Sequence, residues 1–168
     1  KNTERLGTGM DKLLMLLEED ARLTPAQLAV MLNTTEEAVR EAIRKYAREG
    51  VILAYKTLID WDRTEREYVT ALIEIKVTPH IGKGFDKVAK RICQYPEVRD
   101  LYLMSGGFDL AAMIEGRSLR DVALFVAEKL AVLEDVTSTA THFVLRKYKD
   151  KGVEYRVEEK DERSQAGV

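Results

Sequence analysis

Three arginines recur at four-residue intervals in the first third of the chain, at Arg40, Arg44 and Arg48. In a helix this spacing places all three side chains on one face. Guanidinium groups in such a row can run along the phosphates of double-stranded DNA or reach guanine edges. The same segment holds four acids, Glu36, Glu37, Glu41 and Glu49. Because these acids can pair with the arginines, an ordinary solvated helix face is the alternative interpretation.

A second group of residues has the chemistry of a small-ligand site. Residues 101–116 read LYLMSGGFDLAAMIEG, in which Gly106, Gly107 and Asp109 separate two apolar runs. Glycines let a ligand approach the backbone and leave amides for a carboxylate, whereas Asp109 can accept from an ammonium group. That combination suits a zwitterionic amino acid. A tight hairpin in which Asp109 caps its own backbone is the alternative. A predicted turn further on adds a weaker hydroxyl cluster of Thr137, Ser138, Thr139 and Thr141.

The other reactive side chains show no pattern of catalysis or metal binding. His80 and His142 are isolated, and Cys93 falls on an apolar helical face where we expect it to be buried. Their spacing fits neither a metal site nor a nucleophile–base pair. We therefore expect no metal, no cofactor and no enzymatic activity. A single cysteine excludes an internal disulfide and suits the reducing cytoplasm.

The composition is that of a globular protein with a real core. Of the 168 residues, 45% are hydrophobic and 33% are charged, and the net charge is −2. A nucleic-acid role must therefore come from a local arrangement and not from bulk charge. No apolar run approaches the ~18 residues of a membrane span. We expect residues 1–9 to be a remnant of cloning before a natural initiator, Met10, with an ordinary disordered terminus as the alternative.

The arginine row belongs to the third of three predicted helices. The second helix starts with a capping box of Thr24 and Gln27. Thr34 and Glu37 predict another capping box for the third, and Gly50 predicts its end. The expected apolar positions of the two helices are Leu28, Met31 and Leu32, followed by Val39, Ala42, Ile43 and Tyr46. With a first helix over residues 11–20, this pattern predicts a helix-turn-helix.

The segment after the third helix is β-prone. Residues 51–60, VILAYKTLID, predict a strand pair or wing leading out of the helical unit. The polar run that follows indicates a domain boundary near residues 60–66. We therefore expect a winged helix-turn-helix domain with a β linker over residues 10–60.

Residues 61–148 show the pattern of a different domain. Apolar and polar residues alternate over 69–77, which predicts a strand with one buried face. The predicted order is β-α-β-β-α-β, a ferredoxin-like antiparallel sheet with helices on one face, so the whole chain is α+β. Leu72 on the open face indicates a partner subunit. We expect the last strand over 141–148 and a charged, frayed tail over 149–168. The remaining predicted elements are helices over 85–93 and 118–130, the latter with Leu119 on its buried side, and strands on either side of Gly106 and Gly107.

This order of parts resembles the Lrp/AsnC family of feast/famine transcriptional regulators. The resemblance covers roughly residues 10–148 and is carried by EDAR before the second helix, REGVI at the end of the third, PEV before a strand, and GGFD. It implies a cytoplasmic DNA-binding regulator that responds to an amino acid or related metabolite. It also implies homodimers formed through the sheets, which assemble further into rings or octamers.

The resemblance carries over to individual residues. An effector held between subunits would contact Met104, Ser105, Gly106 and Asp109, with the turn at Thr137, Ser138 and Thr139 as a further contributor. DNA would be contacted by Thr34, Thr35, Arg40, Arg44 and Arg48.

Two other functions fit the same architecture. The first is a metabolite-binding oligomer without DNA binding, because the recognition helix is unusually acidic. The second is an enzyme similar to the siroheme decarboxylases, which are expected to use histidine and arginine or tyrosine groups. No histidine or arginine occurs between Leu101 and Leu110, which disfavours the enzyme.

Overall fold

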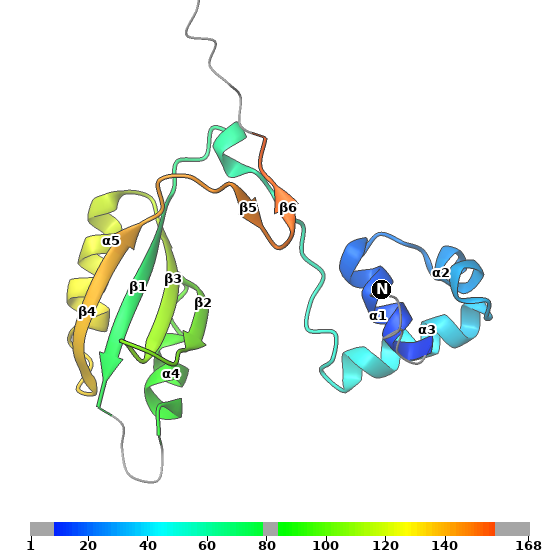
Figure 1. Ribbon diagram of the computed structural model, residues 1–168, viewed down its shortest axis with the longest axis horizontal. Helices are drawn as coiled ribbons and strands as arrows, with labels where there is room; N and C mark the ends of the chain where they lie inside the picture. Colours follow the sequence, from blue (N-terminus) through cyan, green and yellow to red (C-terminus); the bar gives the residue numbers. More distant parts are fainter. Residues whose placement is uncertain (1–8, 79–83, 157–168) are drawn as a thin grey trace, which may run out of the picture. The chain divides into compact units, whose positions relative to one another are not determined.

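The chain divides into two compact units between Ile59 and Asp60. The computed structural model describes residues 9–78 and 84–156 (Figure 1). His80 lies outside the described residues.

The first unit consists of three helices, α1 (Gly9–Glu19), α2 (Pro25–Leu32) and α3 (Glu36–Arg48). Their apolar faces meet in a small core that includes Leu13, Leu28, Val39 and Tyr46. Each of these four side chains is buried, and Leu28 is fully enclosed. Met31 is exposed, contrary to expectation, because the core faces Leu28 and Ala29 on α2.

Local hydrogen bonds fix where α2 and α3 begin. The predicted capping box is confirmed: Gln27 N–H donates to Thr24 Oγ1 at 3.3 Å, and Thr24 N–H donates to Gln27 Oε1 at 2.8 Å. The second predicted box is wrong. Thr35, not Thr34, caps α3 by accepting from Ala38 N–H at 3.2 Å. The third helical position is therefore an alanine, which has no side-chain group to complete a box.

The expected strand pair or wing is absent from residues 51–60, which run as an irregular segment. Leu53 is 88% exposed and Tyr55 is 55% exposed. A β-prone sequence forms a strand only when a neighbouring strand accepts its backbone hydrogen bonds, and no strand pairs with this segment in the described chain.

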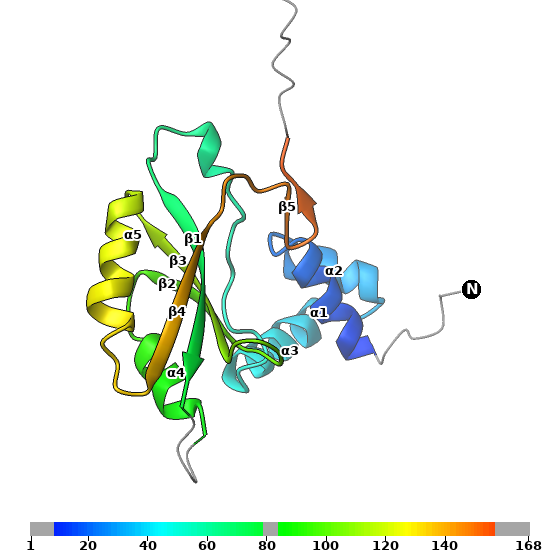
Figure 2. The ribbon, with the colours of Figure 1, turned by 60° about the vertical axis from the view of Figure 1, so that its left-hand side comes forward.

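The second unit is a four-stranded antiparallel sheet with helices packed on one face (Figure 2). Its strands are β1 (Val69–Val77), β2 (Val98–Leu103), β3 (Leu110–Gly116) and β4 (Val136–Phe143), in the spatial order β2-β3-β1-β4. The helices are α4 (Asp86–Ile92) and α5 (Leu119–Phe125), the latter continued by a π-helical stretch over Val126–Leu130. A single 3₁₀ turn, Trp61–Arg63, precedes β1.

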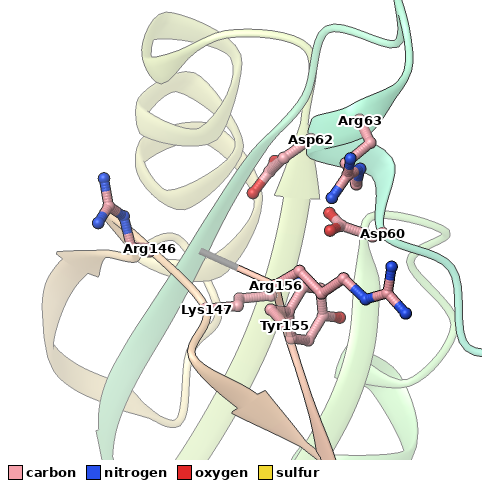
Figure 3. A pocket seen from close by; sticks show the side chains of 7 residues that line it. All are labelled: Asp60, Asp62, Arg63, Arg146, Lys147, Tyr155 and Arg156. Atoms are coloured by element: carbon pink, nitrogen blue, oxygen red, sulfur yellow. The ribbon is translucent and has the colours of Figure 1, made fainter. Parts of the chain in front are cut away.

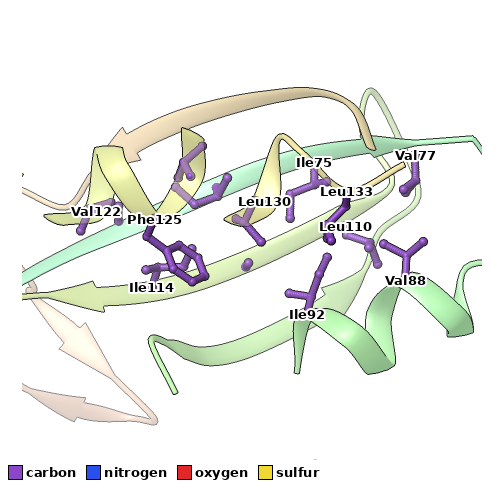
Figure 4. Close-up of a cluster of buried hydrophobic side chains, with 14 residues drawn as sticks. Ile75, Val77, Val88, Ile92, Leu110, Ile114, Val122, Phe125, Leu130 and Leu133 are labelled. Carbon is purple, nitrogen blue, oxygen red and sulfur yellow. The ribbon is translucent and has the colours of Figure 1, made fainter. Parts of the chain in front are cut away.

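The core of this unit lies between the sheet and the helices (Figure 4). Ile73 and Ile75 of β1 are fully buried, as their alternation with polar residues predicts. They pack with Leu110 and Ile114 of β3 and with Leu130. The end of β1 is therefore held in place by a buried core.

Two side chains predicted to lie in the core are exposed. Cys93 is the residue after the last turn of α4, one step round the helix from the buried row of Val88 and Ile92. Leu119 is the first residue of α5, and burial starts one turn later at Val122. The apolar faces of both helices are therefore narrower than the sequence pattern indicates.

The end of the chain also differs from expectation. The last strand of the sheet begins at Val136 and not at Thr141, because Val77 of β1 pairs with Val136. Part of the expected frayed tail is folded: Lys149–Asp150 (β5) pairs with Val153–Glu154 (β6). The connecting residues Lys151 and Gly152 both have positive φ, as a two-residue hairpin turn requires.

Candidate DNA-binding helix and effector loop

The helix-turn-helix places α3 after a three-residue turn. Asn33 ends α2 in the left-handed conformation, with φ 51°, a conformation that asparagine tolerates better than most residues. Thr34 follows and is exposed. The Thr35 hydroxyl oxygen accepts the capping bond, which leaves its O–H free to donate to an acceptor such as a phosphate oxygen.

Each arginine of the row on α3 is paired with a glutamate of the same helix. Arg40 is hydrogen-bonded to Glu36. Arg44 donates to Glu41 at 3.1 Å, and Arg48 donates to the other oxygen of Glu41 at 3.3 Å. The arginine side chains are 50–65% exposed, so the pairs lie at the surface in contact with water. The two interpretations of the row therefore coexist: it is a continuous basic face, and it is internally paired.

Glu41 is the centre of this network. Hydrogen bonds from Arg48 and then Arg44 lower the pKa of its carboxyl group below the ordinary 4.5. For a carboxyl group with a lowered pKa, the stabilisation is complete above the ordinary value and is lost as the pH falls through the lowered one. The network is consequently intact at neutral pH.

The glycine-aspartate loop joins β2 to β3 at the end of the sheet where β1 also ends. Asp109 Oδ2 accepts from Val77 N–H at 2.8 Å, and Asp109 N–H donates to Ile75 O at 3.1 Å. The carboxylate of Asp109 thus caps the backbone of β1, whereas the hairpin interpretation predicted that it caps its own loop. Gly106 has φ 145°, a conformation that favours glycine, and open space surrounds it.

The hydroxyl cluster lies on the other side of β1. Thr137, Ser138 and Thr139 belong to β4, so the predicted turn is wrong. Pairing with β1 holds these residues in the strand, and Thr137 Oγ1 donates to Lys76 O at 3.2 Å. The carboxylate of Asp109 and the hydroxyl of Thr137 therefore bond to adjacent residues at the end of β1.

A single chain does not bring all the predicted effector residues together. Met104 and Ser105 follow β2 and are exposed, and two strands, β3 and β1, separate β2 from β4. Strands lie about 4.8 Å apart, so β2 and β4 are separated by about 14 Å, more than one amino acid spans. Sequence reasoning also missed the end of β1, where Val77 N–H and Lys76 C=O hold the two groups, because main-chain atoms leave no signal in residue types.

Among the residues that the structure describes, no three or more histidine, cysteine, aspartate and glutamate side chains gather as a metal site would require. None of the helices described is both long and apolar enough to cross a membrane.

Comparison with known proteins assigns a class to each unit. A family model described as winged helix-turn-helix DNA-binding matches residues 12–52. A second, described as Lrp/AsnC ligand binding domain, matches residues 70–154. Together with the folds and the helix-turn-helix described above, these matches define a DNA-binding transcriptional regulator that has a ligand-binding domain.

The Lrp/AsnC model, which matches half of the chain, identifies the family, and a sequence relative agrees in being an HTH-type regulator. The HTH-type transcriptional regulator YugG of Bacillus subtilis is 43% identical over 153 residues, which cover 90% of this chain and 92% of that protein. The chain belongs to the Lrp/AsnC family.

Solved structures share the fold at lower identity. AsnC of E. coli has a TM-score of 0.65 and 20% identity, over 84% of this chain and 94% of that one. The transcriptional regulator NMB0573 of Neisseria meningitidis, solved as a complex with L-Met, has a TM-score of 0.69 and 19% identity, over 86% of this chain and 94% of that one. Both comparisons support the α+β fold and its order of elements.

Proposed function

We propose that this regulator binds an amino acid or a related small metabolite between subunits, at the Gly106–Asp109 loop, and that binding changes its attachment to DNA. The observation that carries the proposal is the position of Asp109 and the open Gly106 at the end of β1, where Asp109 Oδ2 accepts from Val77 N–H and Thr137 bonds to the opposite edge of the same strand. Asp109 would accept from the ammonium group, and free amides of the loop would donate to the carboxylate. The L-Met complex of the structural relative supports an amino acid as the ligand class.

A partner subunit would complete this site. Since one chain separates Met104 and Ser105 from Thr137, Ser138 and Thr139, we infer that a neighbouring copy supplies one of the two groups. The open face of the sheet supports association: Leu72, Met113 and Tyr102 lie on it, and Tyr102 is 54% exposed. A homodimer formed through this face would bury them, and further assembly, for example to an octamer, would create the sites between dimers.

DNA recognition would use α3. Thr34 and Thr35 would contact the backbone or a base edge near the start of the helix, Arg40 and Arg44 would read or clamp nearby, and Arg48 would contact phosphate. To bind DNA, each of these arginines would have to give up its ion pair with a glutamate of α3. Two helices in one dimer would compensate for weak attachment of each by raising the effective concentration of the second.

A thermal-shift screen against the twenty amino acids tests the effector site. We expect one or a few amino acids to raise the melting temperature of the wild type and of Glu128→Gln, a control at an exposed residue of the π-helical stretch on the helical side of the sheet. The same ligands should fail to shift Asp109→Asn. A full shift in Asp109→Asn contradicts the site.

Selection of binding sites from random DNA tests the recognition helix. We expect Arg40→Ala and Arg44→Ala to weaken binding to the selected site, whereas Arg22→Ala should not, because Arg22 lies before α2 and pairs with Asp20. Unchanged binding in both α3 variants would show that another surface recognises DNA.

One observation favours a second candidate, a metabolite-binding oligomer that does not bind DNA. All three arginines of the row are already paired within α3. That candidate predicts a ligand-induced thermal shift with no DNA selected at any salt concentration. We assign no catalytic role to any residue in either case.

A further inference from the structure

Residues 145–156, which follow β4 and include the β5–β6 hairpin, carry a concentrated positive charge. They contain five lysines and arginines but two acids, a net charge of +3, in a chain whose net charge is −2. Residues 36–49, which include α3, have four cations and four acids and are neutral as a whole. A local excess of positive charge therefore lies in the second unit and not on the candidate recognition helix.

Four of these cations have no acidic partner within ion-pair distance in the described part of the chain. We call them the hairpin basic surface: Arg146, Lys147, Lys151 and Arg156. The fifth, Lys149, pairs with Glu154 at 3.5 Å. Asp60 and Asp62 line a hollow together with three of the four cations (Figure 3), but they form an ion pair with none of them. The arginines of α3, in contrast, are all paired with glutamates.

The hairpin brings the four side chains to one part of the fold. Tyr155 N–H donates to Tyr148 O at 2.9 Å, so the hydrogen bonding of the hairpin extends one residue pair beyond β5 and β6. Lys147 and Arg156 follow at its base and consequently line the same hollow. Lys151 lies at its tip, in the turn, and is exposed.

Aromatic rings support two of the cations. The guanidinium carbon of Arg146 lies 5.9 Å from the centroid of the Tyr148 ring, and the Lys147 ammonium nitrogen lies 5.5 Å from that of Tyr68. Such contacts restrain a long side chain without neutralising its charge, whereas a glutamate neutralises it. Both cations therefore keep their full charge for an external anion.

The spread of the cations indicates what kind of anion they fit. Lys151 comes four residues after Lys147 along the hairpin, a distance of about 13 Å at about 3.3 Å per residue. One small anion cannot contact both, whereas a DNA duplex carries one negative charge for roughly every 1.7 Å of its axis. The protein is a DNA-binding regulator, so DNA is the polyanion that it meets.

We propose that the hairpin basic surface is a second DNA contact, which binds phosphates independently of the base sequence. Exposed cations that bind phosphates supply affinity without specificity and release the ions condensed on DNA. The surface would thereby supply salt-dependent affinity, of which the internally paired α3 supplies less. The proposal rests on DNA binding by this regulator, but neither on the effector site nor on α3 as the recognition helix. Residues 146–156 also lie outside the 12–52 match to the DNA-binding model.

Fluorescence anisotropy with the whole chain tests the surface, on the selected site and on unrelated DNA of the same length, at several salt concentrations. Each lost phosphate contact should lower the slope of log affinity against log salt by about 0.9. We therefore expect a reduction of about 0.9 for Lys151→Gln and of about 1.8 when Arg146→Gln and Lys147→Gln are combined. The reductions should be equal on the two DNAs, because phosphate contacts carry no sequence information.

An adjacent lysine and arginine on α4 provide the matched control. Lys90→Gln combined with Arg91→Gln removes the same two kinds of charge from exposed positions on the helical side of the sheet, and it should leave the slope unchanged. Melting temperatures show whether each variant is folded. Lys151→Gln, at an exposed turn position, keeps the test valid if the combined variant does not fold.

The outcomes separate this surface from the recognition helix. The proposal is overturned if the folded hairpin variants keep the wild-type slope, if the α4 control lowers it equally, or if affinity falls only for the selected site. Weaker binding in Arg40→Ala with unchanged hairpin variants supports α3 and rejects the hairpin basic surface, and the reverse result rejects α3 and supports the surface. No binding of the wild type to either DNA at low salt rejects both.

Discussion

Replacement of Asp109 by alanine tests the structural role of this residue in the effector loop. Its carboxylate accepts from Val77 N–H at 2.8 Å, and Val77 is 6% exposed. A buried donor that loses its acceptor costs about 1–3 kcal/mol of the free energy of unfolding. For a unit of about this size, 1 kcal/mol corresponds to roughly 4 °C, so we expect the melting temperature to fall by roughly 4–12 °C.

Replacement of Asp109 by asparagine separates stability from recognition. The amide oxygen keeps an acceptor for Val77 N–H and removes the negative charge that would bind an ammonium group. The melting temperature should fall by less than half as much as in Asp109→Ala. Both variants should lose the ligand-induced shift, which for a hundredfold excess of ligand over its dissociation constant is about 2.7 kcal/mol.

Differential scanning fluorimetry measures both effects on the same samples, with Glu128→Gln, at an exposed residue on the helical side of the sheet, as the control. If Asp109→Ala has the same melting temperature as the wild type, the hydrogen bond from Val77 N–H to the carboxylate does not stabilise the fold, and the reasoning is refuted. If Asp109→Asn shifts as much as the wild type with the identified amino acid, the charge is not part of the effector site.

Three further outcomes are expected. Gly106→Ala should lower the melting temperature and Gly107→Ala should not. Space is open around both residues, but only Gly106 has a φ that disfavours side chains. Equal melting temperatures of the two variants in fluorimetry would contradict this. Leu72→Asp should reduce the mass in analytical ultracentrifugation, whereas Leu145→Asp, at a residue that is 97% exposed, should not; an unchanged mass rules out the open face as an interface. Glu41→Gln should raise DNA affinity in fluorescence anisotropy, because it frees Arg48 and leaves Arg44 only its longer contact with Glu37 at 3.5 Å. Glu49→Gln, which affects Lys45, is its control. Weaker binding would show that Glu41 supports recognition.

Periodicity in the sequence was sufficient to predict the helices and strands that bury one regular face. The alternation over 69–77 predicts β1, and the Thr24–Gln27 box predicts the start of α2. Both depend on neighbours a few residues away, and for this reason they can be recognised locally. The ferredoxin-like order follows once these elements are counted.

Elements whose ends depend on distant partners could not be placed in this way. β4 begins at Val136 because the end of β1 lies beside it, and residues 51–60 are irregular because no strand lies beside them. The exposure of Cys93 depends on the width of the α4 face, which its residue types do not reveal.

The same distinction between local and distant information applies to the candidate site. Asp109 and the glycines are recognisable from composition, and so is the row of Arg40, Arg44 and Arg48. The bond from Val77 to Asp109 and the pairing of Glu41 with two arginines are three-dimensional facts. They decide that Asp109 has a structural role beside any role in binding, and that the row is neutralised within its own helix.

The internal pairing of α3 has a consequence for how a regulator of this kind responds to ionic conditions. Free basic side chains on a protein and phosphates on DNA normally shed small ions when they meet, and this release makes attachment fall steeply as salt rises. The arginines of α3 carry covalently tethered counter-ions in Glu36 and Glu41, which stay with the helix when DNA displaces them. Operator occupancy should then vary somewhat less steeply with intracellular salt than three unpaired arginines would make it, while the cations condensed on the DNA are released as usual.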